Sequence, residues 1–228
     1  MRGLYAIVDI DSLNARGLDP VAFAEAVLDA RPAALQLRDK HGSARGTLSL
    51  LRSIGALSRA AGVPFFANDR PDLALLAGCD GVHVGQDDLP VDAVRLLARQ
   101  APPREGLAPL RVGVSTHTRD ELVATVESAP DYAAIGPVFG TQSKADAAPV
   151  VGLDELRARV AHARELAPGL PIVAIGGISE RTAAEVGAVC DAAAVIGALI
   201  PPGSGASFFR EVSERARALH RAVTGGRP

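Results

Sequence analysis

Eight short apolar runs alternate with longer amphipathic stretches along nearly the whole chain, and this alternation constrains the fold more than any other feature. Most of the runs lack a regular polar–apolar alternation, which is typical of parallel strands that are covered on both faces. The sequence predicts strands at Leu4–Val8, Ala34–Leu37, Pro64–Ala67, Gly81–Val84, Arg111–Val114, Tyr132–Ile135, Ile172–Ile175 and Ala192–Ile196.

The stretches between these strands have the periodicity of helices that bury one face. Asp19 is a candidate N-cap for the first of them, and Pro71 is expected to start a further helix. The first predicted helix, after Asp19, is Pro20–Ala30. The remaining predicted helices are Ser43–Ala61, Val91–Gln100, Arg119–Glu127, Leu153–Leu166, Glu180–Gly187 and Ser207–Val223.

A strand–helix unit repeated eight times within 228 residues predicts a single-domain (β/α)8 TIM barrel, which we assign to residues 1–223. The alternative is a doubly wound open sheet. No G-x-G-x-x-G motif follows the first strand and no break in composition marks a second domain, so the barrel is favoured. Residues 224–228 are expected to form a frayed tail.

Composition and charge exclude several classes of protein. The chain is 48% hydrophobic and 22% charged, which is typical of a globular domain, and its net charge of −2 predicts no nucleic-acid partner. The N-terminal apolar run is too short for a signal sequence or a membrane span, so a cytoplasmic location without membrane contact is expected. Cys79 and Cys190 are expected to be small buried residues. The sequence leaves the oligomeric state open, with a homo-oligomer among the alternatives.

Polar residues gather where the predicted strands end, which is where a barrel of this kind carries its working residues. Gln36, Arg38 and Lys40 close the second strand, and alternation puts them on one side of the chain. Asp69 and Asp88 follow the third and fourth strands. Because these strands are neighbours in a barrel, the two carboxylates are expected to face a common space.

Two carboxylates without His or Cys at ligand spacing favour Mg²⁺, which takes oxygen ligands from one or two carboxylates, substrate phosphates and water. Arg38, Lys40 and Lys144 would then hold a polyphosphate. Glycine-rich turns at Gly177 and Gly197 offer backbone N–H groups to a second phosphate. The residues therefore predict a site for small-molecule substrates: a diphosphate with Mg²⁺ and a separate monophosphate.

Structural roles are the alternatives for several of these residues. Asp69 and Asp88 could each cap the helix that follows. His83 is expected to be a hydrogen-bonded structural histidine, whereas a catalytic role stays open for His117 at the end of the fifth strand. What favours the functional interpretation is that all the polar groups fall at the same end of the predicted barrel.

The two basic residues after the second strand have an alternative of their own. Arg38 and Lys40 could form surface ion pairs with Asp39 or Glu25, and such pairs would have little effect on stability. In that case neither side chain would be available for a ligand.

A set of motifs runs in one order from the first strand to the eighth. They are Tyr5–Asp9, Gln36–Lys40, Asn68–Arg70, Asp80–Asp88, Gly113–His117, Asp131–Tyr132, Gly136–Lys144 and Ala174–Ile178. Each motif is weak alone, but the ordered set resembles the thiamine-phosphate synthase (thiamine-phosphate pyrophosphorylase) family and its TenI-like relatives.

The resemblance implies a transferase reaction. Such enzymes join 4-amino-2-methyl-5-hydroxymethylpyrimidine diphosphate to 4-methyl-5-(2-phosphoethyl)thiazole, or its carboxylated form, and yield thiamine phosphate and pyrophosphate. Pyrophosphate departs, and the resulting pyrimidine methylene cation is captured by the thiazole nitrogen. A metal ion and Lys or Arg side chains can neutralise the charge that develops on the departing diphosphate.

The resemblance also implies roles at the diphosphate end of the site. Asp69 and Asp88 match the Mg²⁺ ligands. The remaining matches are to residues that bind the pyrimidine diphosphate, and the basic and hydroxyl groups among them would assist its departure. They are Gln36, Arg38, Lys40, Asn68, Ser115 and Lys144.

At the thiazole-phosphate end, Thr141 and Ser143 match two residues of the loop that contacts the phosphate. Gly177, Ile196 and Gly197 match its backbone cradle. Two departures from the family are visible. The family often has Ser in place of Gly197, so one phosphate contact is expected to be lost, and Ser143 stands where Thr is more common but keeps the hydroxyl.

Three other functions compete with the synthase. A TenI-like thiazole tautomerase keeps the barrel and the thiazole-phosphate end but often loses the diphosphate and metal residues; here His117 would be its acid/base candidate. A non-catalytic regulator could bind thiazole phosphate, and a sugar-phosphate epimerase is another phosphate-handling barrel. Retention of the whole diphosphate and metal set favours the synthase.

Overall fold

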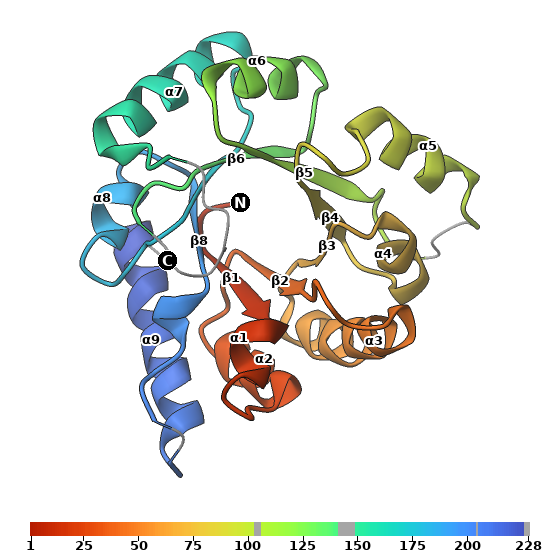
Figure 1. The fold of residues 1–228 in the computed structure, drawn as a ribbon, viewed down its shortest axis with the longest axis vertical. Helices are drawn as coiled ribbons and strands as arrows, with labels where there is room; N and C mark the ends of the chain where they lie inside the picture. Colours follow the sequence, from red (N-terminus) through yellow and green to blue (C-terminus); the bar gives the residue numbers. More distant parts are fainter. Residues whose placement is uncertain (103–105, 141–148, 204, 226–228) are drawn as a thin grey trace.

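The computed structural model describes all residues except 103–105, 141–148, 204 and 226–228. Eight parallel strands form a closed barrel in chain order, with the helices outside it, and this confirms the predicted (β/α)8 fold (Figure 1). The strands are β1 (Gly3–Asp9), β2 (Ala34–Arg38), β3 (Phe65–Asn68), β4 (Gly81–Val84), β5 (Arg111–Thr116), β6 (Tyr132–Ile135), β7 (Ile172–Ile175) and β8 (Ala192–Val195).

The outer ring consists mainly of the helices that the sequence predicts. Their bounds in the structure are α2 (Pro20–Leu28), α3 (Ala44–Ala61), α4 (Pro71–Ala77), α5 (Val91–Gln100), α6 (Arg119–Glu127), α7 (Gly152–Leu166), α8 (Ala183–Gly187) and α9 (Phe208–Thr224). Asp19 caps α2 as predicted, because its carboxylate accepts the N–H of Val21 at 2.9 Å. Two short elements were not predicted: α1 (Ile10–Asn14) and the 3-10 helix η1 (Gly197–Leu199).

The end of the chain differs from the sequence-based expectation. Thr224 belongs to α9 and not to a frayed tail, since it is buried and its hydroxyl donates to the carbonyl of His220 at 3.0 Å. Gly225 then ends the helix in the left-handed conformation that suits glycine. Residues 226–228 of the predicted tail lie outside the described residues.

The barrel interior is filled by side chains that alternate along each strand, as the two-residue period of a strand requires. Three aromatic rings dominate it: Tyr5, Phe66 and Tyr132 lie with centroids 5.6–5.8 Å apart. Gly81 and Gly113 make room for them. A Cβ at Gly81 would lie 2.3 Å from the Phe66 ring, and one at Gly113 would lie 1.9 Å from the Tyr132 ring.

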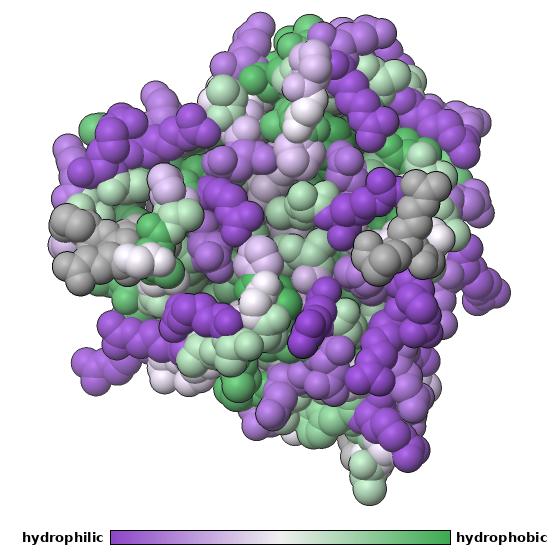
Figure 2. Space-filling model, turned by 180° about the vertical axis from the view of Figure 1, so that it is seen from behind, coloured by the Kyte–Doolittle hydropathy of each residue, from purple (hydrophilic) through white to green (hydrophobic). Residues whose placement is uncertain are grey.

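The opposite faces of the strands pack against the helices and form a second, larger core. Leu35, Leu37, Val82 and Val112 are almost completely buried in this layer. Cys79 and Cys190 are buried, as predicted. In the view of Figure 2, hydrophilic residues cover most of the surface and apolar areas are small. None of the described helices is long and apolar enough to cross a membrane.

Three aspartates make the same kind of hydrogen bond to a strand of the barrel. These aspartates lie directly before β4, β6 and β8. The carboxylate of each accepts, at 2.7–2.8 Å, a backbone N–H at the start of the neighbouring strand β3, β5 or β7. These bonds fix the start of one strand relative to the next, where the regular ladder has not yet begun. The pairs are Asp80 with Phe65, Asp131 with Val112, and Asp191 with Ile172.

Replacing one of these aspartates is expected to lower stability. Asp131→Ala leaves the N–H of Val112 without its acceptor and weakens the pairing of Asp131 with Arg95, 3.7 Å away. We expect a loss of about 1–3 kcal/mol in the free energy of unfolding, measured by urea denaturation. Asp154→Ala, at a fully exposed side chain, is the matched control. An equal, small effect of both variants would contradict the role of Asp131.

His220 on α9 predicts a pH dependence of stability. Its Nδ1 atom is buried and has no hydrogen-bond partner among the described residues. Burial lowers the pKa of this histidine from 6.5. The folded state therefore binds fewer protons than the unfolded state between the lowered pKa and 6.5, so stability falls as the pH drops through that window. We expect His220→Leu to unfold with a shallower dependence on pH between 7 and 5; an unchanged slope would contradict it.

Candidate active site

A layer of polar side chains lies above the aromatic rings, at the carboxyl ends of β2 to β5. Gln36 is only 2% exposed, and its Nε2 donates to Oδ1 of Asn68 at 2.8 Å. On the next two strands, His83 Nε2 lies 2.8 Å from Ser115 Oγ. Thus the structure brings together Gln36, Asn68 and Ser115, three of the residues that the family resemblance assigns to the pyrimidine diphosphate.

Asp69 and Asp88 stand beside this layer on the turns after β3 and β4. Asp69 has a left-handed backbone with φ of 61°, and its N–H donates to the carbonyl of His83 at 2.8 Å. Such a conformation is uncommon for residues other than glycine, although Asp adopts it more readily than most. Oδ2 of Asp88 accepts the N–H of Gly85 at 2.7 Å and closes the turn after β4.

Neither carboxylate caps a helix, so the structural alternative for this pair is wrong. The N-cap of α4 is Arg70 and that of α5 is Pro90, and neither helix start has a side-chain cap. The carboxylate of Asp69 pairs instead with the ammonium group of Lys40. Asp88 uses one oxygen for the turn.

The charges around Asp69 oppose one another. Burial raises the pKa of Asp69 most strongly, the Lys40 ammonium group acts against this, and the neighbouring Asp88 carboxyl group raises the pKa further. Two carboxyl groups are therefore close enough to compete for one proton or one cation. Their oxygens form a donor pair of the kind that suits a hard cation.

Arg38 has a partner that the sequence did not reveal. Its Nη1 lies 2.5 Å from Oδ1 of Asp9, which is 2% exposed at the end of β1, and 3.9 Å from Asp11. Surface pairs with Asp39 or Glu25 were the alternative, and it is wrong. Asp9 also accepts the N–H of the third following residue and so caps α1. That capping spacing was the one signal in the sequence that could have identified it.

Asp39 has a separate, local function. Its carboxylate accepts the N–H of Gly42 at 2.8 Å and the hydroxyl of Thr47 at 2.7 Å, so it shapes the turn between β2 and α3. This turn carries Lys40 toward Asp69 and away from Asp39.

The two histidines of this end differ. His83 is buried and both ring nitrogens are hydrogen-bonded, as expected for a structural histidine. His117 lies at the start of α6, where its N–H and its Nδ1 are 2.6 Å and 3.3 Å from Oε2 of Glu121. Nη1 of Arg159 donates to its carbonyl at 2.7 Å. These contacts tie His117 to helices α6 and α7.

The turns after β7 and β8 form the other end of the site. Gly177 has φ of 63°, and a Cβ there would lie 2.4 Å from the carbonyl oxygen of Gly140, so only glycine fits. This close contact joins the turn to the segment after β6, as does the bond from Phe139 N–H to the carbonyl of Gly176 at 3.0 Å. Ile196 packs on the barrel interior.

Gly197 differs from Gly177 in its surroundings. It begins η1, and a Cβ at this position would meet no atom of the described residues within 4 Å. The space therefore allows the serine that is common in the family. Three predicted residues of the loop after β6, Thr141, Ser143 and Lys144, lie outside the described residues.

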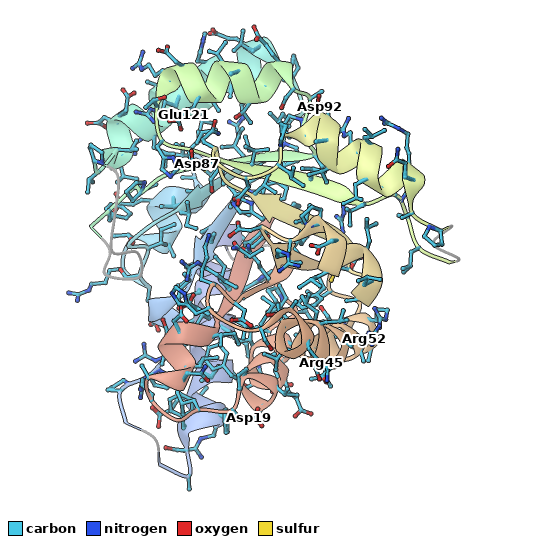
Figure 3. The ribbon with its side chains drawn as sticks, turned by 45° about the vertical axis from the view of Figure 1, so that its right-hand side comes forward. Asp19, Arg45, Arg52, Asp87, Asp92 and Glu121 are labelled. Carbon is cyan, nitrogen blue, oxygen red and sulfur yellow. The ribbon has the colours of Figure 1, made fainter. Side chains whose placement is uncertain are left out.

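Acidic residues lie in the first turns of α5 and α6, at this end of the barrel. Figure 3 shows Asp92 on α5 and Glu121 on α6, each in the first turn, with Asp87 on the turn after β4. Carboxylates at helix starts interact favourably with the helix dipole. The labelled residues of α3, Arg45 and Arg52, are basic instead.

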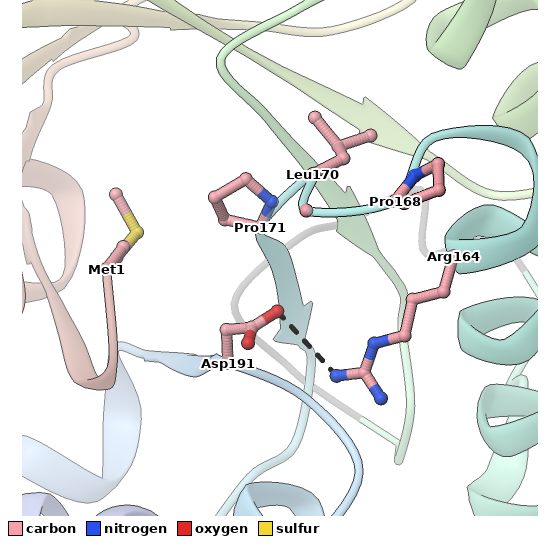
Figure 4. Close-up of a pocket in the computed structure, with 7 residues that line it drawn as sticks. Met1, Arg164, Pro168, Leu170, Pro171 and Asp191 are labelled. Atoms are coloured by element: carbon pink, nitrogen blue, oxygen red, sulfur yellow. Dashed lines mark ion pairs between the residues drawn. The ribbon is translucent and has the colours of Figure 1, made fainter.

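A pocket of about 470 Å³ lies at the opposite end of the barrel, before β7 and β8 (Figure 4). Arg164 and Asp191 line it and pair with each other at 3.8 Å, and the carboxylate of Asp191 also accepts the N–H of Ile172. Met1 and Pro171 supply apolar walls. None of the predicted site residues that the structure describes lines this pocket.

The comparisons with known proteins agree with the geometry. The family model described as thiamine monophosphate synthase matches residues 4–199. A thiamine-phosphate synthase of Chloroflexus aurantiacus is 39% identical, with 86% of this chain and 84% of that protein covered. One from Koribacter versatilis is 41% identical over 92% of this chain and 94% of its own length.

A solved structure is similar over nearly the whole length. The thiamine phosphate pyrophosphorylase of Pyrococcus furiosus superposes with a TM-score of 0.77 and is 29% identical, and the alignment covers 98% of this chain and 97% of that one. Fold, ordered motifs and sequence relatives thus converge. The chain belongs to the thiamine monophosphate synthase family of transferases.

Proposed function

We propose that this protein joins 4-amino-2-methyl-5-hydroxymethylpyrimidine diphosphate to 4-methyl-5-(2-phosphoethyl)thiazole, or its carboxylated form, and releases pyrophosphate with the help of Mg²⁺. The observation that carries the proposal is the convergence of oxygen donors and cations at the ends of β2 to β4. Lys40 lies against Asp69, Asp69 interacts with Asp88, and Gln36 holds Asn68 beside them.

The basic residues would bind the diphosphate by exchanging partners. Arg38 and Lys40 are held at their positions by Asp9 and Asp69. A diphosphate offers stronger charge-assisted hydrogen bonds than one carboxylate does, and a guanidinium can bind phosphate oxygens through two N–H groups. The ligand would therefore draw both side chains toward it, while Gln36 and Asn68 offer amide groups to the pyrimidine.

Mg²⁺ would be held by Asp69 and Asp88. The structure describes no cluster of three or more metal-ligating side chains, and two carboxylates are what Mg²⁺ usually takes from a protein when phosphates and water complete its shell. When bound, the ion would neutralise negative charge on the departing pyrophosphate. Release of Asp69 from Lys40 would free the ammonium group for the same phosphate oxygens.

The chain's own residues would then assist departure. The hydroxyl group of Ser115 can donate to a diphosphate oxygen, and Arg38 and Lys40 stabilise the charge that develops as the C–O bond breaks. The resemblance assigns Lys144 the same task. The thiazole nitrogen carries its own lone pair and needs no general base, so the pyrimidine methylene group is captured directly once the phosphate of the thiazole is seated near Gly177.

An assay of pyrophosphate release tests the function. The purified protein would be incubated with the pyrimidine diphosphate, the thiazole phosphate and Mg²⁺, with and without EDTA. We expect release that requires all three components. A folded protein that binds the thiazole phosphate but releases no pyrophosphate would contradict the proposal and favour a TenI-like tautomerase.

Substitution of a metal ligand is expected to separate activity from folding. Asp69→Asn removes one anionic ligand, so we expect kcat to fall by about 10²-fold or more while the melting temperature changes little. The matched control is Asp87→Asn, an exposed carboxylate in the turn that holds Asp88. A lower melting temperature with unchanged kcat would make Asp69 a structural residue.

The open space at Gly197 allows a gain of affinity to be predicted. Gly197→Ser places a hydroxyl group where a Cβ meets no atom of the part of the chain that the structure describes within 4 Å, so it can bond the thiazole phosphate without displacing that part. One added hydrogen bond should lower the KM for the thiazole phosphate roughly three- to tenfold and leave the KM for the diphosphate unchanged. Gly197→Ala is the control without a hydroxyl group. Equal effects of both variants would place the phosphate elsewhere.

A further inference from the structure

A continuous chain of hydrogen bonds runs through the barrel interior and ends at Ser115. Tyr5 Oη lies 2.9 Å from Tyr132 Oη, Tyr132 Oη lies 2.8 Å from His83 Nδ1, and His83 Nε2 lies 2.8 Å from Ser115 Oγ. The chain thus connects the aromatic layer near the base of the barrel with the polar layer at its working end.

All four side chains are buried. Tyr5 is 2% exposed and Tyr132 is 1% exposed, and burial raises the pKa of both phenols, so both stay protonated. The His83 ring stacks on the Tyr132 ring with centroids 5.6 Å apart and an angle of 19°. The geometry therefore leaves the histidine little freedom to rotate away from its two partners.

The hydrogen-bonding capacity of the four groups gives the chain a direction. A hydroxyl group donates one hydrogen, and a neutral imidazole donates through one nitrogen and accepts through the other. If Tyr132 Oη accepted from both Tyr5 and His83, its own buried hydrogen would have no acceptor among the described residues, so the bonds run one way along the chain. If they ran from Ser115 toward Tyr5, the buried Tyr5 hydroxyl would need a further acceptor, and Tyr132 is its only partner among the described residues. If they run from Tyr5 toward Ser115, every buried hydrogen has an acceptor.

A positive charge acts on the two phenols at the base of the barrel. Arg111 begins β5 and stacks over the Phe66 ring, 5.0 Å from its centroid, and it is close enough to act electrostatically on Tyr5 and Tyr132. A guanidinium group repels hydroxyl hydrogens and attracts hydroxyl oxygens. The positive charge therefore favours arrangements in which the phenol hydrogens point away from Arg111.

We propose that His83 carries its proton on Nε2 and donates it to Ser115 Oγ, which turns the hydroxyl hydrogen of Ser115 outward to the ligand. His83 is then a positioning residue that acts through Ser115 and touches no substrate. The value of this arrangement to the reaction rests on the proposed function, in which that hydroxyl hydrogen binds a diphosphate oxygen. The direction of the chain itself does not depend on it.

The tautomer of His83 can be measured without substrate. Two-dimensional ¹H–¹⁵N spectra of the histidine-labelled protein distinguish protonated from unprotonated ring nitrogens, and the signals of His83 are identified by their loss in His83→Gln. We expect a neutral ring with the proton on Nε2. A proton on Nδ1, or an imidazolium ring at neutral pH, would overturn the proposal.

Kinetics then test whether His83 acts through Ser115. The amide nitrogen of Gln can replace Nε2 as donor to Ser115, whereas the side chain of Asn is too short to reach it. We therefore expect His83→Gln to keep kcat within about threefold of wild type and His83→Asn to lower kcat about tenfold. Ser115→Ala should lose about 10²-fold. In the Ser115→Ala background, His83→Asn should cause no further loss, because its effect is transmitted by the missing hydroxyl group.

The controls separate this proposal from the proposed function. His162→Gln on the surface of α7 should leave kcat unchanged. Additive losses in the double variant would overturn the positioning role and make His83 a general structural residue. A wild-type protein that releases no pyrophosphate would contradict the proposed function alone, and the tautomer measurement would still decide the direction of the chain.

Discussion

The packing of Tyr5, Phe66 and Tyr132 inside the closed barrel is the interaction on which the remaining structure depends. A barrel of eight strands has an interior just wide enough for side chains, and three rings fill its lower half because Gly81 and Gly113 leave space beside them. The three rings form an aromatic layer across the barrel interior. The next interior-facing side chains along the strands are polar, and they lie on the side of the aromatic layer that faces the carboxyl ends of the strands.

The aromatic layer also fixes the position of a side chain in the polar layer. The hydroxyl group of Tyr132 lies in the aromatic layer and bonds His83 in the polar layer, so the two layers are joined by a defined hydrogen bond. Gln86 adds a bond to the backbone of Ser115 at 2.6 Å from outside the barrel. Ser115 is thus fixed from both sides, which suits the proposed role of its hydroxyl group in binding a ligand.

Pairing of opposite charges organises the rim. The basic residues after β2 are each held by a carboxylate from a neighbouring strand: Arg38 by Asp9 of β1, and Lys40 by Asp69 after β3. Buried or half-buried charges need such partners because desolvation disfavours the isolated ion. A ligand that carries a diphosphate and a divalent cation brings both kinds of charge at once. It can therefore satisfy the cations and the carboxylates together.

The sequence alone determined the strand–helix order, the barrel and the end of it that carries the polar residues, because buried parallel strands and amphipathic helices have different periods of hydrophobicity. Only the tertiary structure decided which polar groups meet. It assigned Asp9 to Arg38, excluded the helix-cap interpretation of Asp69 and Asp88, and joined His83 to Tyr132 and Ser115. These pairs connect residues that are far apart in the chain, and the order and register of the strands in the barrel set their distances.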